Sequence, residues 1–292
     1  MKTAYYCFGG GLGHLTRFIA WCHTTGTQPL LLTNCSAAGM PGLLPAGVRC
    51  QQPSEADQQN KDTLRSWLSR VITAENPQQL VIDAFPGGIL GELAGLPELT
   101  GLDCLYLARI LKVDAYLPRL AGAVLPKFAQ IYRVEKLHEE HESWLHELSD
   151  HITGLPLRDP PPPAMTAAML ATLPQDFELI VHSGSESELR QLYNLLHETW
   201  LIEGTSGSVV VVSPGPRPAF LADDDFHLDC YPAGAVIERA RRVFSAAGCN
   251  IMRQMAAQKK PHQVLPLPRA LDDQFFRAAC QIKNSRDHAM SQ

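Results

Sequence analysis

The first candidate for chemistry is a glycine-rich stretch that ends in a histidine. It reads FGGGLGHLTR over residues 8–17 and contains Gly10, Gly11, Gly13 and His14. Glycines permit positive φ and close approach to a ligand, and the start of a following helix offers N–H groups to an anion or polar group. His14, with an unperturbed pKa of about 6.5, could take a proton from a hydroxyl at neutral pH. The stretch predicts a ligand loop with a candidate general base; a tight turn with a capping or packing histidine is the alternative.

A carboxylate follows a second apolar run. Asp83 ends the run QLVID at residues 79–83 and is followed by the turn-like AFPGG. The carboxyl ends of parallel strands meet at one edge of a sheet, where ligands bind. Asp83 could therefore orient His14 or an acceptor group. A turn-forming aspartate is the alternative.

A second small-residue loop reads HSGSESE over residues 182–188, again after an apolar run. Gly184 and Ser185 could offer backbone and hydroxyl donors to a diphosphate at the start of the next helix. The glutamates of the loop argue partly against this, because carboxylates repel phosphate unless they point away. The alternative is an ordinary helix N-cap and acidic first turn.

The last quarter of the chain holds a glycine turn at Gly248 and a Pro/Arg/Asp loop over residues 266–274. The loop follows a predicted strand that ends at residue 265, a place where α/β domains bind ligands. It contains Asp272, Asp273 and Gln274, whose polar groups suit a hydroxyl-rich ligand. The alternative is that the carboxylates only stabilise the dipole of the next helix.

These motifs lie within an alternation of strand-like and helix-like segments, which is typical of βαβ units and a mainly parallel sheet. In the first half, strands are expected at residues 3–8, 29–33, 79–84, 103–108 and 130–134, and helices at 14–24, 55–73, 88–95 and 137–150. In the second half, strands are expected at 177–182, 208–213 and 227–231; another strand begins at residue 243, and the last strand ends at residue 265. A helix is expected at 187–199, and further helices before and after the last strand.

The alternation is interrupted by consecutive prolines at residues 160–163. Prolines in series cannot continue a helix or a central strand and favour a stiff spacer. We therefore predict two tandem α/β domains, residues 1–158 and 164–292. A hinge between two such domains makes a cleft, and clefts of this kind are favoured ligand sites.

Composition narrows the class of protein. The chain has 292 residues, 45% of them hydrophobic and 19% charged, with a formal net charge of -5. Because the chain has no net positive charge to attract phosphates, nucleic acid is not an expected partner. The 8 cysteines show no pattern of metal ligands, so we expect free thiols in a reducing cytosol and no metal site.

No apolar run approaches the roughly 18 residues that cross a bilayer, and the N-terminus lacks the core of an export signal. We expect a cytoplasmic protein whose contact with a membrane is at most peripheral, at the inner face. Residues 106–127 include both apolar and basic side chains, which could contact a lipid carrier. The alternative is ordinary core with snorkelling lysines and arginines.

Together the motifs resemble nucleotide-sugar glycosyltransferases of the GT-B fold, in which two Rossmann-like domains face each other across a cleft. The similarity is to family 28, which includes the bacterial transferase that adds N-acetylglucosamine to lipid-linked muramyl-pentapeptide. Residues 9–14 resemble that family's first-domain glycine loop, and Gly184-Ser185 resembles the GlySer of its second domain. Residues 245–278 match best, with an AlaGly turn, a strand ending in a proline and an Asp/Gln loop.

The resemblance implies an inverting, metal-independent hexosyltransferase that uses no cofactor and takes a nucleotide-sugar donor, with UDP as the expected nucleotide. It implies His14 as base, Asp83 as its helper, Gly10, Gly11 and Gly13 on the acceptor side, and an unidentified acceptor, for which a lipid-linked compound is a candidate. The donor residues it implies are Gly184, Ser185, Gly248, Asn250, Arg253, Gln254, Arg269, Asp272, Asp273 and Gln274.

The chain departs from the family in two places. Gln254 occupies the position where the family usually has a glutamate that binds the ribose of the nucleotide. The hydrogen bonds of an amide lack the charge-assisted strength of those of a carboxylate. The chain also stops soon after a helix expected at 272–284, whereas the family continues through further helices. Two alternatives follow: a nucleotide-sugar epimerase or hydrolase on the same scaffold, and a non-catalytic protein that binds nucleotide sugars.

Overall fold

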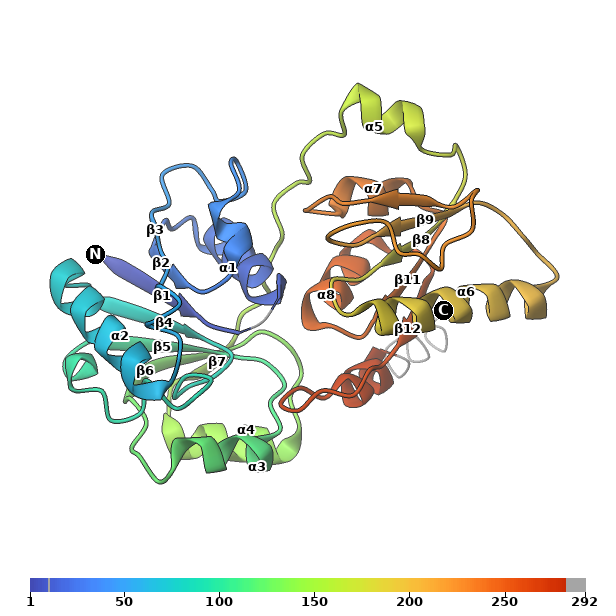
Figure 1. Ribbon diagram of the computed structural model, residues 1–292. Coiled ribbons are helices and arrows are strands. Elements are labelled where there is room, and N and C mark those ends of the chain that lie inside the picture. The colour runs from blue at the N-terminus through green and yellow to red at the C-terminus, as the bar shows by residue number, and fades with distance from the viewer. Residues whose placement is uncertain (10, 282–292) are drawn as a thin grey trace. The chain divides into compact units, whose positions relative to one another are not determined.

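A computed structural model describes residues 1–9 and 11–281. The chain divides into two compact units, each built on a parallel β-sheet (Figure 1). The first unit is Met1–Asp159 with Arg269–Asp273, and the second is Pro160–Pro268 with the segment from Gln274 onward. The boundary between the two units lies between Asp159 and Pro160, at the start of the run of prolines.

The first unit contains a 7-stranded parallel sheet in the order β3-β2-β1-β4-β5-β6-β7. The strands are β1 Thr3–Cys7, β2 Leu30–Thr33, β3 Cys50–Gln51, β4 Gln79–Asp83, β5 Asp103–Ala108, β6 Phe128–Arg133 and β7 Ile152–Gly154. In the register of the sheet, Tyr5 lies between Leu31 and Val81. The carboxyl ends of β1 and β4 are therefore neighbours.

Helices cover both faces of this sheet, which explains why β1 is apolar at successive positions. Tyr5 and Cys7 pack in one core cluster with Phe18 of α1 (Gly13–Thr25). Side chains alternate along a strand, so Phe8 points to the opposite face. There its ring lies 5.8 Å from that of Trp67 on α2 (Lys61–Glu75).

The remaining helical elements of the first unit are short: η1 Ser36–Gly39, η2 Pro97–Leu99, α3 Val113–Tyr116, η3 Leu117–Leu120 and α4 Glu139–Leu148. The helix predicted at residues 88–95 is wrong, because this stretch consists of turns. Gly88 and Gly91 adopt φ of 85° and 79°, which interrupts a right-handed helix. The short strands β3 and β7 were not predicted.

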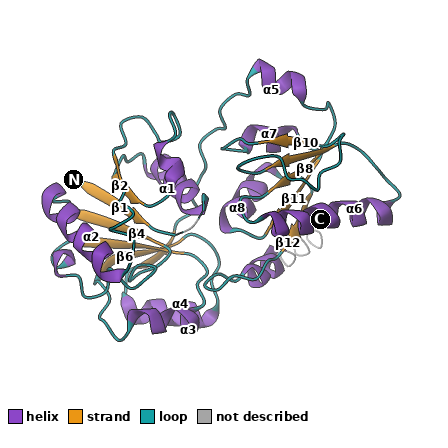
Figure 2. Cartoon of the chain, in the orientation of Figure 1, coloured by secondary structure: helices purple, strands orange, loops and turns teal. Residues whose placement is uncertain are grey.

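The second unit contains a 5-stranded parallel sheet in the order β10-β9-β8-β11-β12. Figure 2 distinguishes the strands of this unit from its helices by colour. Its strands are β8 Glu178–Val181, β9 Val209–Val212, β10 Phe226–Leu228, β11 Arg242–Ala246 and β12 His262–Leu265, and its helices are α5 Ala167–Thr172, α6 Glu186–Glu203, α7 Gly234–Arg239 and α8 Cys249–Gln258. Residues 274–281 are also helical.

The two faces of the second sheet are also covered by helices. Ile180 of β8 packs in a cluster with Leu192 of α6. The next residue back along the same strand, Leu179, packs with Ile237 of α7 and Met255 of α8. Burial on both faces accounts for the apolar runs that predicted these strands.

The cysteines, which all lie in the described part of the chain, form no disulfide in the structure. Among the residues that the structure describes, no helix combines the length and apolar character needed to cross a membrane.

Candidate functional site

The structure brings His14 and Asp83 into direct contact in the first unit. His14 lies in the first turn of α1, and Asp83 is the last residue of β4. His14 Nδ1 is 2.6 Å from Asp83 Oδ2. Two residues that the sequence singled out therefore form one buried pair at the carboxyl edge of the sheet.

Arg17 is the third member of this cluster. Its Nε donates to Asp83 Oδ1 at 2.6 Å, and its Nη2 donates to Asp83 Oδ2 at 2.8 Å. The same Nη2 lies 3.3 Å from His14 Nδ1. No role was predicted for Arg17, although its position three residues after His14 places both side chains on one face of a helix.

The three side chains are almost fully enclosed: His14 is 7% exposed, Arg17 3% and Asp83 2%. Burial lowers the pKa of His14, although the hydrogen bond and the charge of Asp83 act in the opposite direction. Burial by itself would raise the pKa of Asp83, but the charge of Arg17 and the hydrogen bonds from His14 and Arg17 outweigh it and lower the pKa. At neutral pH the cluster therefore holds a neutral imidazole, a carboxylate and a guanidinium.

The contact with Asp83 fixes the imidazole tautomer. Because an ionised carboxylate only accepts hydrogen bonds, Nδ1 of His14 carries the proton and Nε2 carries the lone pair. Nε2 points at Gly9, where a Cβ atom would lie 2.4 Å from it. Gly9 has φ of 151° and donates its N–H to Oδ1 of Asn34 at 3.2 Å.

The remaining glycines of this loop occupy different positions. Gly10 lies outside the described residues. Gly11 has φ of 85° with open space where a Cβ would stand, and Gly13 is the first residue of α1. Their acceptor-side role stays a prediction.

Aromatic and cationic groups lie beside the cluster. The ring of Phe85 is 5.8 Å from that of His14, and the guanidinium of Arg109 lies 5.5 Å from the centre of the Phe85 ring. The chain turns between Asp83 and Phe85 through Ala84, at φ of 67°, whose carbonyl accepts from Tyr106. The positive charge of Arg109 also favours the neutral form of His14.

In the second unit, the predicted diphosphate loop begins helix α6. Ser185 is the N-cap, and its hydroxyl accepts from the backbone N–H of Glu188. The Glu188 carboxylate bonds His182 Nε2 at 2.9 Å and lies over Gly184, where a Cβ would be 2.1 Å from Oε2. This geometry agrees with the N-cap alternative and places a negative charge on the loop.

The AlaGly turn also begins a helix. Gly248 is the N-cap of α8, and Arg253 donates to Asn250 Oδ1 at 2.9 Å one turn along it. Gln254 is half-buried on the same helix. Arg277, which the sequence analysis did not single out, is buried and donates to the Ala247 carbonyl at 2.8 Å.

The Asp/Gln loop is divided between the two units. Asp272 forms an ion pair with Arg109 at 2.9 Å, and Asp273 Oδ2 lies 3.4 Å from His138 Nε2. Gln274 is 5% exposed, and its Oε1 accepts from the backbone N–H of Leu267 at 3.0 Å.

Arg269 belongs to the first unit, and its carbonyl accepts from Lys112 Nζ at 3.0 Å. The structure therefore shows partners within the protein for Arg269 and for the acidic and amide residues that follow it in the loop. The donor-binding roles of these residues stay predictions.

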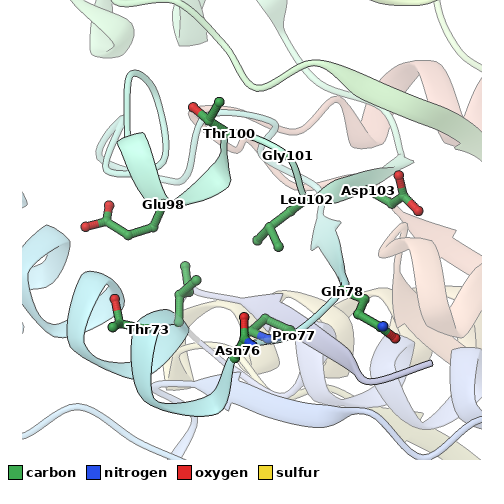
Figure 3. Close-up of a pocket in the computed structure, with 10 residues that line it drawn as sticks. Thr73, Asn76, Pro77, Gln78, Glu98, Thr100, Gly101, Leu102 and Asp103 are labelled. Carbon is green, nitrogen blue, oxygen red and sulfur yellow. The ribbon is translucent and has the colours of Figure 1, made fainter.

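A hollow of ≈ 600 Å³ lies at the opposite edge of the first sheet (Figure 3). It is lined at the amino ends of β4 and β5 by residues that include Gln78, Glu98 and Asp103. Ligands of parallel α/β sheets bind at the carboxyl ends. We therefore place the candidate site at the His14 cluster.

Comparison with known proteins identifies the fold. The chain matches no family model and no curated protein sequence. It is similar to the solved structure of the spinosyn forosaminyltransferase SpnP, with a TM-score of 0.63 and 13% identity over 97% of this chain and 83% of that one. It is also similar to the spinosyn rhamnosyltransferase SpnG complexed with thymidine diphosphate, with a TM-score of 0.60 and 15% identity over 96% and 84%.

An epimerase has a similar structure. For the UDP-N-acetylglucosamine 2-epimerase from Rickettsia bellii the TM-score is 0.59, with 11% identity over 94% of this chain and 80% of that one. At such identities the likeness shows the fold alone. The predicted fold class, two tandem Rossmann-like α/β domains of the GT-B type, is confirmed.

Proposed function

We propose that this protein is a glycosyltransferase that moves a sugar from a nucleotide-sugar donor to an acceptor hydroxyl. The observation that carries the proposal is the buried contact between His14 Nδ1 and Asp83 Oδ2, at 2.6 Å, at the carboxyl edge of the first sheet. A neutral histidine held in this tautomer has its Nε2 lone pair available for a proton. The fold supports the proposal, because several solved structures that share it are glycosyltransferases.

In the proposed reaction, Nε2 of His14 removes the acceptor proton while the acceptor oxygen attacks the sugar carbon directly. Direct displacement inverts the configuration at that carbon and releases a nucleoside diphosphate. Asp83 keeps the imidazole oriented and accepts the Nδ1 hydrogen bond throughout. We propose that the helix starts at Ser185 and Gly248 bind the diphosphate through backbone N–H groups, with no metal in the reaction.

The first test is His14→Ala with a matched control, His23→Ala. His23 lies on the same helix and is exposed, so its loss should leave the reaction unchanged. Turnover is measured as nucleoside diphosphate released from UDP- and TDP-linked sugars with a panel of hydroxyl acceptors, lipid-linked saccharides included. Removal of a general base should lower the rate by about 10²–10⁴-fold.

Donor binding is measured separately, as a shift of the melting temperature. A donor at 100 times its dissociation constant stabilises the folded protein by about 2.7 kcal/mol, and this shift should survive in His14→Ala. Full turnover in His14→Ala would contradict the assignment of the base.

A second candidate is a nucleotide-sugar epimerase, which the likeness to the epimerase structure favours. The same assay separates the two activities by their products. An epimerase would convert the donor in the absence of any acceptor, whereas a transferase would give a glycosylated acceptor. Donor binding without any product would support a non-catalytic protein that binds nucleotide sugars.

A further inference from the structure

Arg17 holds Asp83 by both carboxylate oxygens. Its Nε bonds Oδ1 at 2.6 Å and its Nη2 bonds Oδ2 at 2.8 Å, which is the parallel fork that a guanidinium makes with a carboxylate. Arg17 is itself 3% exposed, so the pair is shielded from water. Two hydrogen bonds fix the rotation of the carboxylate plane, which a single contact would leave free.

The carboxylate of Asp83, fixed in this way, contacts the imidazole of His14. Oδ2 of Asp83 accepts from Arg17 Nη2 and also lies 2.6 Å from His14 Nδ1. The guanidinium therefore aims the oxygen that fixes the tautomer of His14. Arg17 does so from the Nδ1 side of the ring, where its Nη2 lies 3.3 Å from that nitrogen.

Arg17 also sets the charge that the imidazole experiences. A buried carboxylate without a counter-charge would draw a proton onto a neighbouring histidine, because an opposite charge within about 4–6 Å favours the charged form. The guanidinium compensates Asp83, and its Nη2, 3.3 Å from Nδ1, opposes a positive charge on the ring directly. Both effects favour the neutral imidazole.

Other titratable groups near the cluster do not replace this charge. Tyr5 and Cys7 on β1 and Tyr106 on β5 all have pKa values raised well above their ordinary values by burial, so they stay uncharged at neutral pH. Arg109, beyond β5, adds a further positive charge that also disfavours the imidazolium.

We propose that Arg17 is a positioning residue of this site, which holds Asp83 in a fixed and charge-compensated orientation and so keeps His14 neutral, with the proton on Nδ1 and the lone pair on Nε2. The proposal rests on the proposed function, in which His14 is the base. It adds that the ability of His14 to act as a base at neutral pH depends on a neighbouring side chain that acts through Asp83.

The first measurement needs no activity. The ring nitrogens of His14 are followed by NMR across pH in the wild-type protein, with His14→Ala used to assign the signal. We expect a neutral ring with protonated Nδ1 at pH 7. An imidazolium, or a ring with the proton on Nε2, would overturn the proposal.

The second measurement compares Arg17→Gln with Arg17→Lys. Glutamine removes the positive charge and keeps one donor, so the pKa of His14 should rise by about one to three units. Lysine keeps the charge, so the pKa should stay close to that of the wild type. An unchanged pKa in a folded Arg17→Gln variant would overturn the proposal, and circular dichroism checks the fold of both variants.

The dependence of kcat/KM on pH separates positioning from a general loss of structure. In Arg17→Gln the acid limb of kcat/KM should move to higher pH by the same one to three units. At pH values on that limb the rate should fall by about tenfold for each unit of the displacement and recover as the pH rises. Arg17→Lys should restore the profile. A uniform loss at every pH would indicate a merely structural role.

The proposed function and this inference fail in different ways. If His14→Ala keeps its turnover, His14 is not the base, yet the NMR titration still decides whether Arg17 controls its protonation.

Discussion

At the scale of single residues, the orientation of His14 depends on a neighbour that has no side chain. A Cβ atom at Gly9 would lie 2.4 Å from His14 Nε2, so Gly9→Ala must displace either the loop or the ring. We expect this variant to lose most of the turnover and to be destabilised by about 1–3 kcal/mol, the usual cost of a glycine-only backbone conformation.

The matched control for this prediction is Gly11→Ala. Gly11 also has a positive φ, of 85°, but among the described residues other than its chain neighbours no atom lies within 4 Å of the Cβ position. It should show a similar loss of stability, measured by thermal unfolding, while more of the turnover remains. Equal loss of turnover in both variants would show that backbone strain, and not contact with the imidazole, causes the effect.

Sequence reasoning found His14 and Asp83 but could not decide between their alternatives. That decision depends on the register that places the end of β4 beside β1, and no local pattern encodes it. Arg17 received no role because arginine on a helix is ordinarily exposed. Its burial follows only from the carboxylate that faces it.

At the scale of elements, the turns after β4 depend on one buried carboxylate. Glu92 is 0% exposed and accepts from the backbone N–H groups of Ile89, at 3.1 Å, and Leu90, at 2.7 Å, and from the hydroxyl of Tyr6. Glu92→Ala would leave these donors without their acceptor. We expect the free energy of unfolding to fall by about 1–3 kcal/mol or more, measured by urea denaturation.

Glu55→Ala is the control for this prediction, because Glu55 is an exposed loop residue. Its removal should change the stability by less than about 0.5 kcal/mol. If Glu92→Ala were as stable as Glu55→Ala, the hydrogen bonds of Glu92 would not be what organises these turns.

The same segment shows where element prediction fails. Residues 88–95 contain enough leucine, alanine and glutamate to suggest a helix, but the backbone of Gly88 and Gly91 and the contacts of Glu92 favour turns. The longer strands were predictable because both faces of each sheet are covered, which requires continuous apolar runs. β3 and β7, with 2 and 3 residues, are too short to leave such a run.

At the scale of the whole molecule, the sequence predicted two α/β domains, and the chain has two sheets of this kind. What it could not predict is that Arg269–Asp273 groups with the first unit. Leu271 packs in a cluster with Phe85 and Tyr116, and Asp272 pairs with Arg109. Contacts between residues so far apart in sequence have no local signature.

The two units should unfold as separate cooperative steps, because the described core clusters draw their residues from one unit each. Leu31 and Leu192 are both 0% exposed, one in a cluster of each unit. Calorimetry should resolve two unfolding transitions. Leu31→Ala and Leu192→Ala should each reduce the free energy of unfolding by about 2–5 kcal/mol, and each should lower the temperature of a different transition. Two variants that lower both transitions together would show a single cooperative unit.

Nucleotide binding can then be assigned to one unit. A ligand stabilises the unit that binds it, so UDP or TDP should raise the transition that Leu192→Ala lowers if Gly184, Ser185 and Gly248 bind the diphosphate. A rise confined to the transition that Leu31→Ala lowers would place the nucleotide in the first unit, beside His14. That outcome would contradict the donor assignment while leaving the roles of His14 and Arg17 to their own tests.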